Sequence, residues 1–145
     1  MIAMLDMFLI NIVVVVAVVI VHYEFLYRLN RFIPRWHVLH RYRIVIGLLG
    51  ALLAHAIEIW LFAIAYYFAV STDVLGGLSG AFDGTFLDCV YYSFTVFTTL
   101  GFGDIFPEGD IRFLTGIESL TGLVLITWTA SYLFLDMQHY WSDRE

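Results

Sequence analysis

The sequence has few charged residues, no lysine, two prolines and a single cysteine. Only 14% of its 145 residues are charged and 61% are hydrophobic, whereas soluble chains are about half apolar and about a quarter charged. A chain of this size could not bury so much apolar surface in one core, which excludes a soluble globular domain. The lone cysteine, Cys89, excludes an intrachain disulfide and gives no sign of a redox role.

Long apolar runs take the place of the missing charges. Three of them, at about 2–21, 44–70 and 113–135, are near or above the ~20 residues that cross a bilayer as a helix. The first has no basic segment before it and no small-residue cleavage site after it, so we expect a retained helix and not a signal peptide. The sequence therefore predicts an all-α membrane protein with three transmembrane helices.

The uneven distribution of charge sets the expected orientation. The link between the first two runs contains most of the basic residues, namely Arg28, Arg31, Arg35, Arg41 and Arg43. Basic links remain cytoplasmic, so the N-terminus should lie outside and the C-terminus in the cytoplasm. The stretch between the second and third runs is acidic, as an outer loop should be, with Asp73, Asp83, Asp88, Asp104, Glu108 and Asp110.

The basic link, 23–43, is also rich in aromatic residues. This composition suits a segment in the inner headgroup zone, with rings in the interface and the arginines on anionic lipid headgroups. An ordinary positively charged turn is an equal alternative. The compact size and the lack of targeting signals favour a multi-pass protein of a plasma membrane, specifically a bacterial inner membrane.

A shorter apolar segment, 85–98, is typical of a helix that begins with a capping box, Thr85-x-x-Asp88. At about 1.5 Å per residue it is roughly 21 Å long, too short to cross the bilayer. Because the loop before it is outside and the third run must lead inward, we expect a re-entrant helix with a non-helical return through Gly101, Gly103 and Pro107. Such backbone is tolerated at membrane depth where it lines a water-filled cavity, and several copies around an axis would build one.

The residues from Tyr91 to Asp104, Tyr-Tyr-Ser-Phe-Thr-Val-Phe-Thr-Thr-Leu-Gly-Phe-Gly-Asp, resemble the pore helix and signature sequence of potassium channels. The family pattern is Thr-Val-Gly-Tyr-Gly-Asp, and the resemblance covers about 44–135. It implies an outer helix 44–70, a pore helix 85–98, a filter strand 99–103 and an inner helix 113–137, between an extra N-terminal helix 1–22 and a short tail 138–145. It also implies a four-fold homotetramer that conducts potassium passively, since several chains must close the filter.

Potassium must exchange its water shell for protein oxygens, and the resemblance implies which residues supply them. The K⁺ ligands would be the backbone carbonyls of Thr99, Leu100, Gly101 and Phe102, and Gly103 would complete the filter. Glycine allows backbone angles that alternate in hand, so that successive carbonyls can point inward. Leu100 and Phe102 should wedge against the pore helix, and Phe102 lacks the tyrosine hydroxyl that often ties the filter to that helix.

Residues around the filter have expected supporting roles. Asp104 and Glu108 would attract cations to the outer mouth, and the filter would be supported by Tyr91, Tyr92, Thr95, Thr98 and Glu118. For Glu118, a carboxylate inside a span, we favour a structural polar contact over a pH gate. His55 and Glu58 lie three residues apart on one helix face and could pair.

The inner helix offers a candidate gate. Gly122 is either a hinge or a helix-packing residue, and the sequence favours neither. Helical stepping places Leu123, Ile126, Ala130 and Phe134 on one face that could line the cavity. Phe134 is a candidate hydrophobic constriction.

Other functions predict different features. A weakly selective cation channel of the same fold would differ in its reversal potential, a membrane-embedded metalloenzyme would use His55, Glu58 and Glu118, and a non-conducting accessory subunit would not form homotetramers. His37 and His40 have no further ligand cluster and are expected to be an interfacial pair. We expect no enzyme activity, no nucleic-acid partner and no cofactor besides the permeant K⁺ ions.

Overall fold

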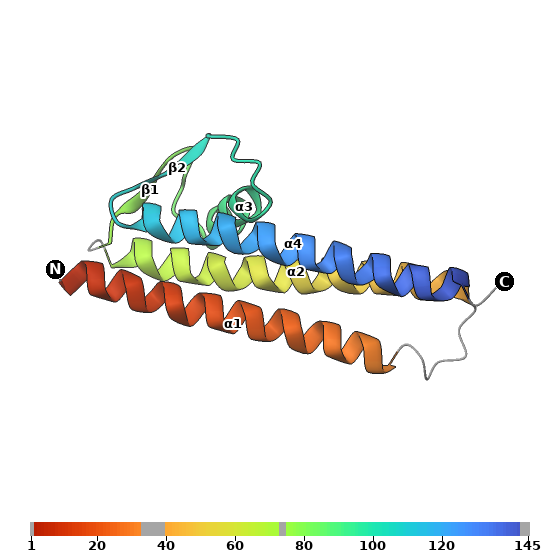
Figure 1. Ribbon diagram of the computed structural model, residues 1–145. Coiled ribbons are helices and arrows are strands. Elements are labelled where there is room, and N and C mark those ends of the chain that lie inside the picture. The colour runs from red at the N-terminus through yellow and green to blue at the C-terminus, as the bar shows by residue number, and fades with distance from the viewer. Residues whose placement is uncertain (1, 33–39, 73–74, 143–145) are drawn as a thin grey trace.

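The computed structural model describes residues 2–32, 40–72 and 75–142. In chain order the elements are α1 (Ile2–Phe32), α2 (His40–Ser71), β1 (Gly77–Gly80), α3 (Phe86–Phe97), β2 (Ile105–Glu108) and α4 (Ile111–Ser142). In Figure 1, α1, α2 and α4 run alongside one another, while α3 and both strands lie against the half of the bundle that contains the N-terminus of α1. The small elements are therefore concentrated near one end of the long helices.

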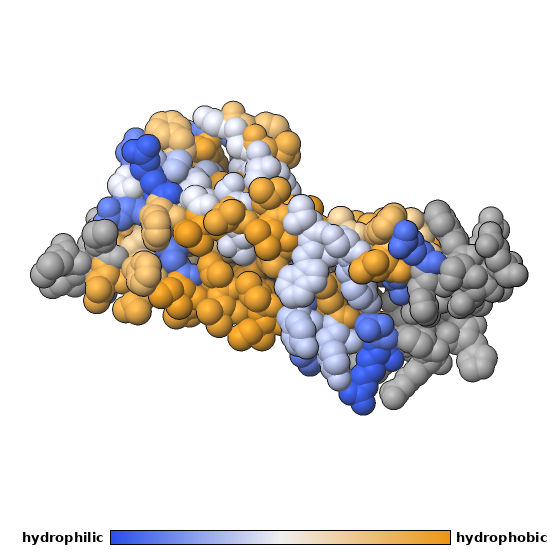
Figure 2. All heavy atoms as spheres, in the orientation of Figure 1, coloured by the Kyte–Doolittle hydropathy of each residue, from blue (hydrophilic) through white to orange (hydrophobic). Residues whose placement is uncertain are grey.

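Each of the three long helices contains a stretch long and apolar enough to cross a membrane, namely Leu5–Arg31, Ile44–Ser71 and Ile111–Gln138. Their outer surfaces carry large apolar side chains, and those of Leu5, Val13 and Leu49 are 64%, 65% and 60% exposed. Figure 2 shows this surface as an orange region over the bundle. The expectation of a mostly helical protein with three candidate spans is confirmed.

Helix α1 is longer than the sequence analysis predicted. It continues to Phe32, so residues 23–32, expected to belong to the link, are helical. Neither proline nor glycine occurs in this stretch, and Arg28 Nε donates to Glu24 Oε1 at 3.0 Å, a pair four residues apart that supports a helix. Residues 33–39 of the link, with Arg35 and His37, lie outside the described residues.

The other long helices also exceed their predicted bounds. Helix α2 begins at His40, before the expected start at 44, and α4 extends from Ile111 to Ser142. Most of the expected tail, 138–145, is thus a continuation of α4. Hydropathy marks the part of a helix that suits lipid, and it does not mark where the backbone hydrogen bonds end.

Small residues bring α2 close to its neighbours. Ala51, Ala54, Ala63 and Ala69 are at most 3% exposed. Helices in a membrane associate through close van der Waals contact, because lipid is as apolar as their side chains and gives no hydrophobic driving force. Larger side chains fill the core around α3, where the Phe62 and Phe97 rings lie 6.4 Å apart.

The two strands join the chain before α3 to the chain after it. They pair antiparallel, with Gly77 opposite Glu108 and Gly80 opposite Ile105. The sequence predicted an outer loop between the second and third apolar runs, without strands. Gly80 instead has a φ of 96°, and a Cβ at this position would lie 2.1 Å from the Asp104 carbonyl oxygen, so glycine allows the close approach. The pairing fixes the place at which the chain leaves the α3 region.

Candidate functional site

Helix α3 begins with the predicted capping box. The Asp88 backbone N–H donates to Thr85 Oγ1, and the Thr85 backbone N–H donates to Asp88 Oδ2, both at 3.1 Å. The second bond stabilises the carboxylate and holds the pKa of Asp88 below its ordinary value. The Asp83 backbone N–H donates to the same oxygen, so one carboxylate fixes both the helix start and the turn before it.

The buried side of α3 is held by Glu118 of α4. Ser93 Oγ on α3 donates to Glu118 Oε1, and the Tyr66 hydroxyl on α2 donates to Glu118 Oε2, each at 2.5 Å. Glu118 is fully buried. The expected polar contact with the short helix is therefore present, and it joins three helices at one carboxylate. The partner on α2, Tyr66, was not foreseen from the sequence.

In the segment after α3, the sign of the backbone angle φ alternates from residue to residue. Thr99, Gly101 and Gly103 have φ values of 60°, 52° and 80°, whereas the residues between them, Leu100 and Phe102, do not have positive φ. Positive φ in a β-branched residue such as Thr99 is strained and is concentrated at functional sites. The Gly101 backbone N–H donates to the Thr95 carbonyl at 3.0 Å, which holds the segment beside α3.

The same segment is exposed in the single chain. Leu100 and Phe102 are 64% and 66% exposed, and a Cβ added at Gly101 or Gly103 would meet nothing within 4 Å. The expected contact of Leu100 and Phe102 with the pore helix is a prediction about the assembled filter, and it stays a prediction. Their apolar surface is available to a neighbouring molecule.

The outer end of the segment is attached to α3 through Tyr91. The Tyr91 hydroxyl donates to Asp104 Oδ2 at 2.7 Å. This bond lowers the pKa of Asp104 and raises the pKa of Tyr91, because it favours the charged carboxylate and the neutral phenol. It provides a link between the short helix and the segment although Phe102 has no hydroxyl. Both side chains are exposed, and Glu108, the other residue expected at the outer mouth, is the last residue of β2, opposite Gly77.

The remaining supporting residues bond to α4 or within α3 and its end. The Tyr92 hydroxyl lies 3.0 Å from Thr115 Oγ1 of α4. Thr95 Oγ1 donates to the Tyr92 carbonyl and Thr98 Oγ1 to the Phe94 carbonyl, so these two hydroxyls are used inside or at the end of α3. Thr95 meets the segment through its backbone carbonyl and not through its side chain.

The residues predicted for the gate lie along α4. Gly122 faces the end of α3, where a Cβ would lie 2.1 Å from the Phe97 carbonyl oxygen. This contact provides the helix-packing role, while the hinge stays a prediction. Further along α4, the side chains predicted to line the cavity are all exposed in the single chain: Leu123, Ile126, Ala130 and Phe134.

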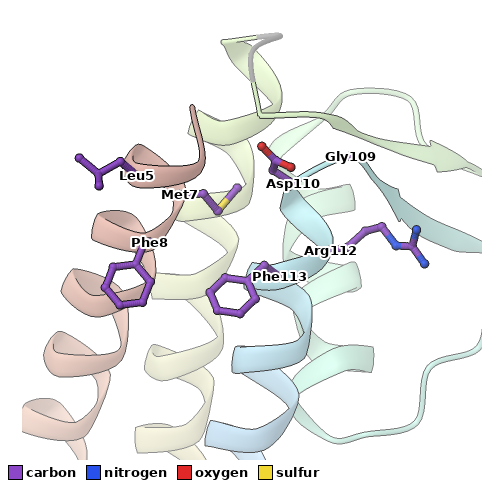
Figure 3. A pocket seen from close by; sticks show the side chains of 7 residues that line it. All are labelled: Leu5, Met7, Phe8, Gly109, Asp110, Arg112 and Phe113. Carbon is purple, nitrogen blue, oxygen red and sulfur yellow. The ribbon is translucent and has the colours of Figure 1, made fainter. Parts of the chain in front are cut away.

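A separate hollow of about 760 Å³ lies between α1 and the start of α4. Figure 3 shows Phe8 of α1 and Phe113 of α4 on its two sides, with Asp110 and Arg112 near the beginning of α4. None of the residues 98–104 lines it, so this hollow is distinct from the exposed segment.

The predicted pair of His55 and Glu58 is confirmed, with Nδ1 and Oε2 2.8 Å apart. Glu118, the third ligand of the metalloenzyme alternative, is instead bonded to Ser93 and Tyr66. His37 lies outside the described residues, as does the side chain of His40.

Comparison with known proteins bears on the whole arrangement. A protein-family model described as an ion channel matches residues 42–138. The chain belongs to this ion-channel family. It is the two-transmembrane, pore-type family that the segment 91–104 resembles, and the matched residues take in β1, α3, β2 and nearly all of α2 and α4. No match was found among curated proteins or among solved structures. Helix α1 lies before the matched residues of this ion channel.

Proposed function

We propose that four copies of this chain form a potassium-selective channel whose filter is the segment Thr99-Leu100-Gly101-Phe102-Gly103. The main support for the proposal is the alternating sign of φ along the segment, which is positive at Thr99, Gly101 and Gly103. Alternation allows successive carbonyl oxygens to face one axis, where rings of oxygens from four chains replace the water shell of K⁺.

The tetramer accounts for the exposed surface of the segment. In the single chain Leu100 and Phe102 expose about two thirds of their side chains, at 64% and 66%. In the proposed assembly, neighbouring subunits cover these side chains and the carbonyls face the axis. One chain supplies one filter strand, so identical neighbours are needed to close each ring of oxygens.

The proposed topology makes α3 the re-entrant pore helix. Its 12 residues are too few to cross a bilayer. The partial negative charge at its C-terminal end favours a dehydrated cation in the cavity, and Asp104 adds negative charge at the outer mouth. Arg28, which is 65% exposed near the C-terminal end of α1, would then face cytoplasmic headgroups.

Reversal potentials of the purified full chain in planar bilayers test this function. With potassium on one side and sodium on the other, we expect a reversal potential near the potassium equilibrium potential. A reversal potential that is unchanged when sodium replaces potassium identifies the weakly selective cation channel instead. Monomeric protein without current identifies the non-conducting accessory subunit.

A further inference from the structure

A buried polar cluster joins the helix outside the matched ion-channel residues to the helices inside them. It consists of His22 on α1 and His55 and Glu58 on α2, and the side chains are 1%, 15% and 0% exposed. Glu58 Oε1 lies 2.8 Å from His22 Nδ1, and Glu58 Oε2 lies 2.8 Å from His55 Nδ1. One carboxylate thus faces two imidazole nitrogens. No pattern in the sequence placed His22 beside these two residues.

The other edges of the two imidazoles meet at a single hydroxyl. Thr129 Oγ1 of α4 lies 3.4 Å from His22 Nε2 and 3.1 Å from His55 Nε2. The rings are stacked with centroids 5.5 Å apart, and Trp128 lies 5.2 Å from His22. The cluster therefore has a fixed ring orientation, aromatic walls and contacts to three helices.

Counting protons shows that the cluster lacks one hydrogen when Glu58 is ionised and both imidazoles are neutral. Four contacts link the two imidazoles to Glu58 and Thr129, and each needs a hydrogen. Two neutral imidazoles and one hydroxyl supply three hydrogens, while an ionised carboxylate supplies none. Without a further cation, one contact is left without a hydrogen and the buried group has a net negative charge. A buried charge of this kind is costly unless it is paired.

The donor atoms fit a metal ion. The ligand atoms of His22, His55 and Glu58 all lie within 4.8 Å of one another. Zinc bonds to histidine nitrogen and carboxylate oxygen are about 2.0–2.2 Å long. An ion between the Nδ1 atoms and the carboxylate would therefore replace the two hydrogen-bonded contacts of 2.8 Å and move the imidazole nitrogens slightly away from the carboxylate oxygens. The Nε2–H groups would then both donate to Thr129 Oγ1, the kind of contact that orients metal-bound histidines.

We propose that His22, His55 and Glu58 bind a divalent transition-metal ion such as Zn²⁺ within the helix bundle and thereby fasten α1 to α2. Two imidazoles and a carboxylate are ligands that suit zinc, whereas magnesium and calcium prefer oxygen alone. The site does not depend on the proposed potassium selectivity, since it lies outside the segment 98–104.

Zinc content of the purified full chain tests the proposal. The protein is stripped with a chelator, loaded with Zn²⁺, freed of unbound metal by gel filtration and analysed by mass spectrometry. We expect about one zinc per chain in the original protein, and loss of that zinc in His22→Gln and Glu58→Gln. The control Glu118→Gln should retain it, since Glu118 is bonded to Ser93 and Tyr66 and does not belong to the cluster.

Two further measurements test the proposed zinc site even where a variant fails to fold. X-ray absorption of the zinc-loaded original protein should show two imidazole nitrogens and carboxylate oxygen. Thr129→Val removes no ligand, and we expect it to weaken zinc binding about 10- to 100-fold, the usual effect of losing a group that orients a ligand. Absence of retained zinc in the original protein, or equal zinc in folded His22→Gln, overturns the proposal and assigns the cluster to a bound proton.

Discussion

Thr99 occupies a backbone conformation that few β-branched residues adopt. Its φ of 60° begins the alternation that continues at Gly101 and Gly103. Positive φ costs a residue with a side chain about 1–2 kcal/mol, so the surrounding structure must hold Thr99 in place. The bonds from Thr99 N to the Val96 carbonyl and from Gly101 N to the Thr95 carbonyl do so from both sides. The strain is local and lies where the proposed ion path requires it.

Gly101→Ala should abolish potassium-selective current. The added methyl group meets no atom of its own chain, but it opposes a φ of 52°, so the loss is expected from backbone conformation and not from a clash. The cost of about 1–2 kcal/mol would be repeated in every subunit. Bilayer recording measures the current, and membrane extraction verifies insertion.

Gly77→Ala is the matched control, because Gly77 also has open space around its Cβ but has no positive φ. We expect normal selectivity from this variant. Unchanged selective current in Gly101→Ala would contradict the assignment of the filter.

Tyr91→Phe should change the response of the channel to external acid. The Tyr91 hydroxyl stabilises the Asp104 carboxylate and lowers its pKa, so in the original protein Asp104 stays charged until the pH falls through this lowered value. Without the hydroxyl the pKa rises toward its ordinary range, and protonation begins at higher pH. We expect the fall in single-channel conductance to shift to higher external pH.

Tyr67→Phe serves as the comparison, since Tyr67 packs its ring against Phe68 and Phe86 and is not bonded to Asp104. An identical pH profile for Tyr91→Phe and the original protein would show that Asp104 does not set the mouth charge.

The short helix α3 is positioned by polar contacts at its buried side and by close packing at its end. Ser93 donates to Glu118 of α4, and Gly122 of α4 lies against the Phe97 carbonyl. The sequence identified Glu118 and Gly122 as unusual residues of an inner helix. It did not reveal Tyr66 as a second donor, because a tyrosine at the end of an apolar run is typical of a membrane interface.

Ser93→Ala should destabilise the packing of α3. It leaves Glu118 Oε1 without its donor in a buried site, a loss of about 1–3 kcal/mol. Thermal unfolding of the purified protein measures the effect as a lower midpoint. Ser131→Ala is the control, because Ser131 is exposed and donates within its own helix to the Thr127 carbonyl. Equal midpoints for the two variants would argue against a stabilising role for the Glu118 contacts.

Gly122→Ala should separate α4 from α3. Its Cβ would lie 2.1 Å from the Phe97 carbonyl oxygen, whereas a Cβ at Gly116 would meet nothing within 4 Å. We expect a loss of about 1–3 kcal/mol, as for overpacking elsewhere, with little change in Gly116→Ala. Thermal unfolding of both variants provides the comparison. Unchanged stability of Gly122→Ala together with altered channel opening would favour the hinge.

In the proposed tetramer, subunits would meet on surfaces that are exposed in the single chain. The segment 98–104 is exposed, as is the face of α4 that contains Leu123, Ile126 and Phe134. Four-fold association would cover the filter segment and leave the α4 face around a water-filled cavity. Helix α1, outside the matched residues, is anchored by His22 to Glu58 and Thr129.

The proposed tetramer should be more stable in potassium than in sodium. An ion that binds between the subunits stabilises the assembly in proportion to its affinity for the assembled state. We expect native mass spectrometry to show tetramers, and heating in detergent to dissociate them at a higher temperature in potassium. A monomer in both salts, or equal dissociation temperatures, would contradict a shared potassium site.

The membrane environment, the three candidate spans, the capping box at Thr85 and the glycine-bearing segment after α3 could all be predicted from the amino-acid sequence. These features depend on the composition and spacing of residues that are close together in the chain, so they can be recognised without knowing how the helices pack. Three features are visible only in the folded chain: β1 pairs with β2, Tyr66 and Ser93 both bond to Glu118, and His22 lies against His55 and Glu58. Such contacts join residues far apart in the chain, and apolar helices can pack in many registers, so their partners follow from the packing and not from any local pattern.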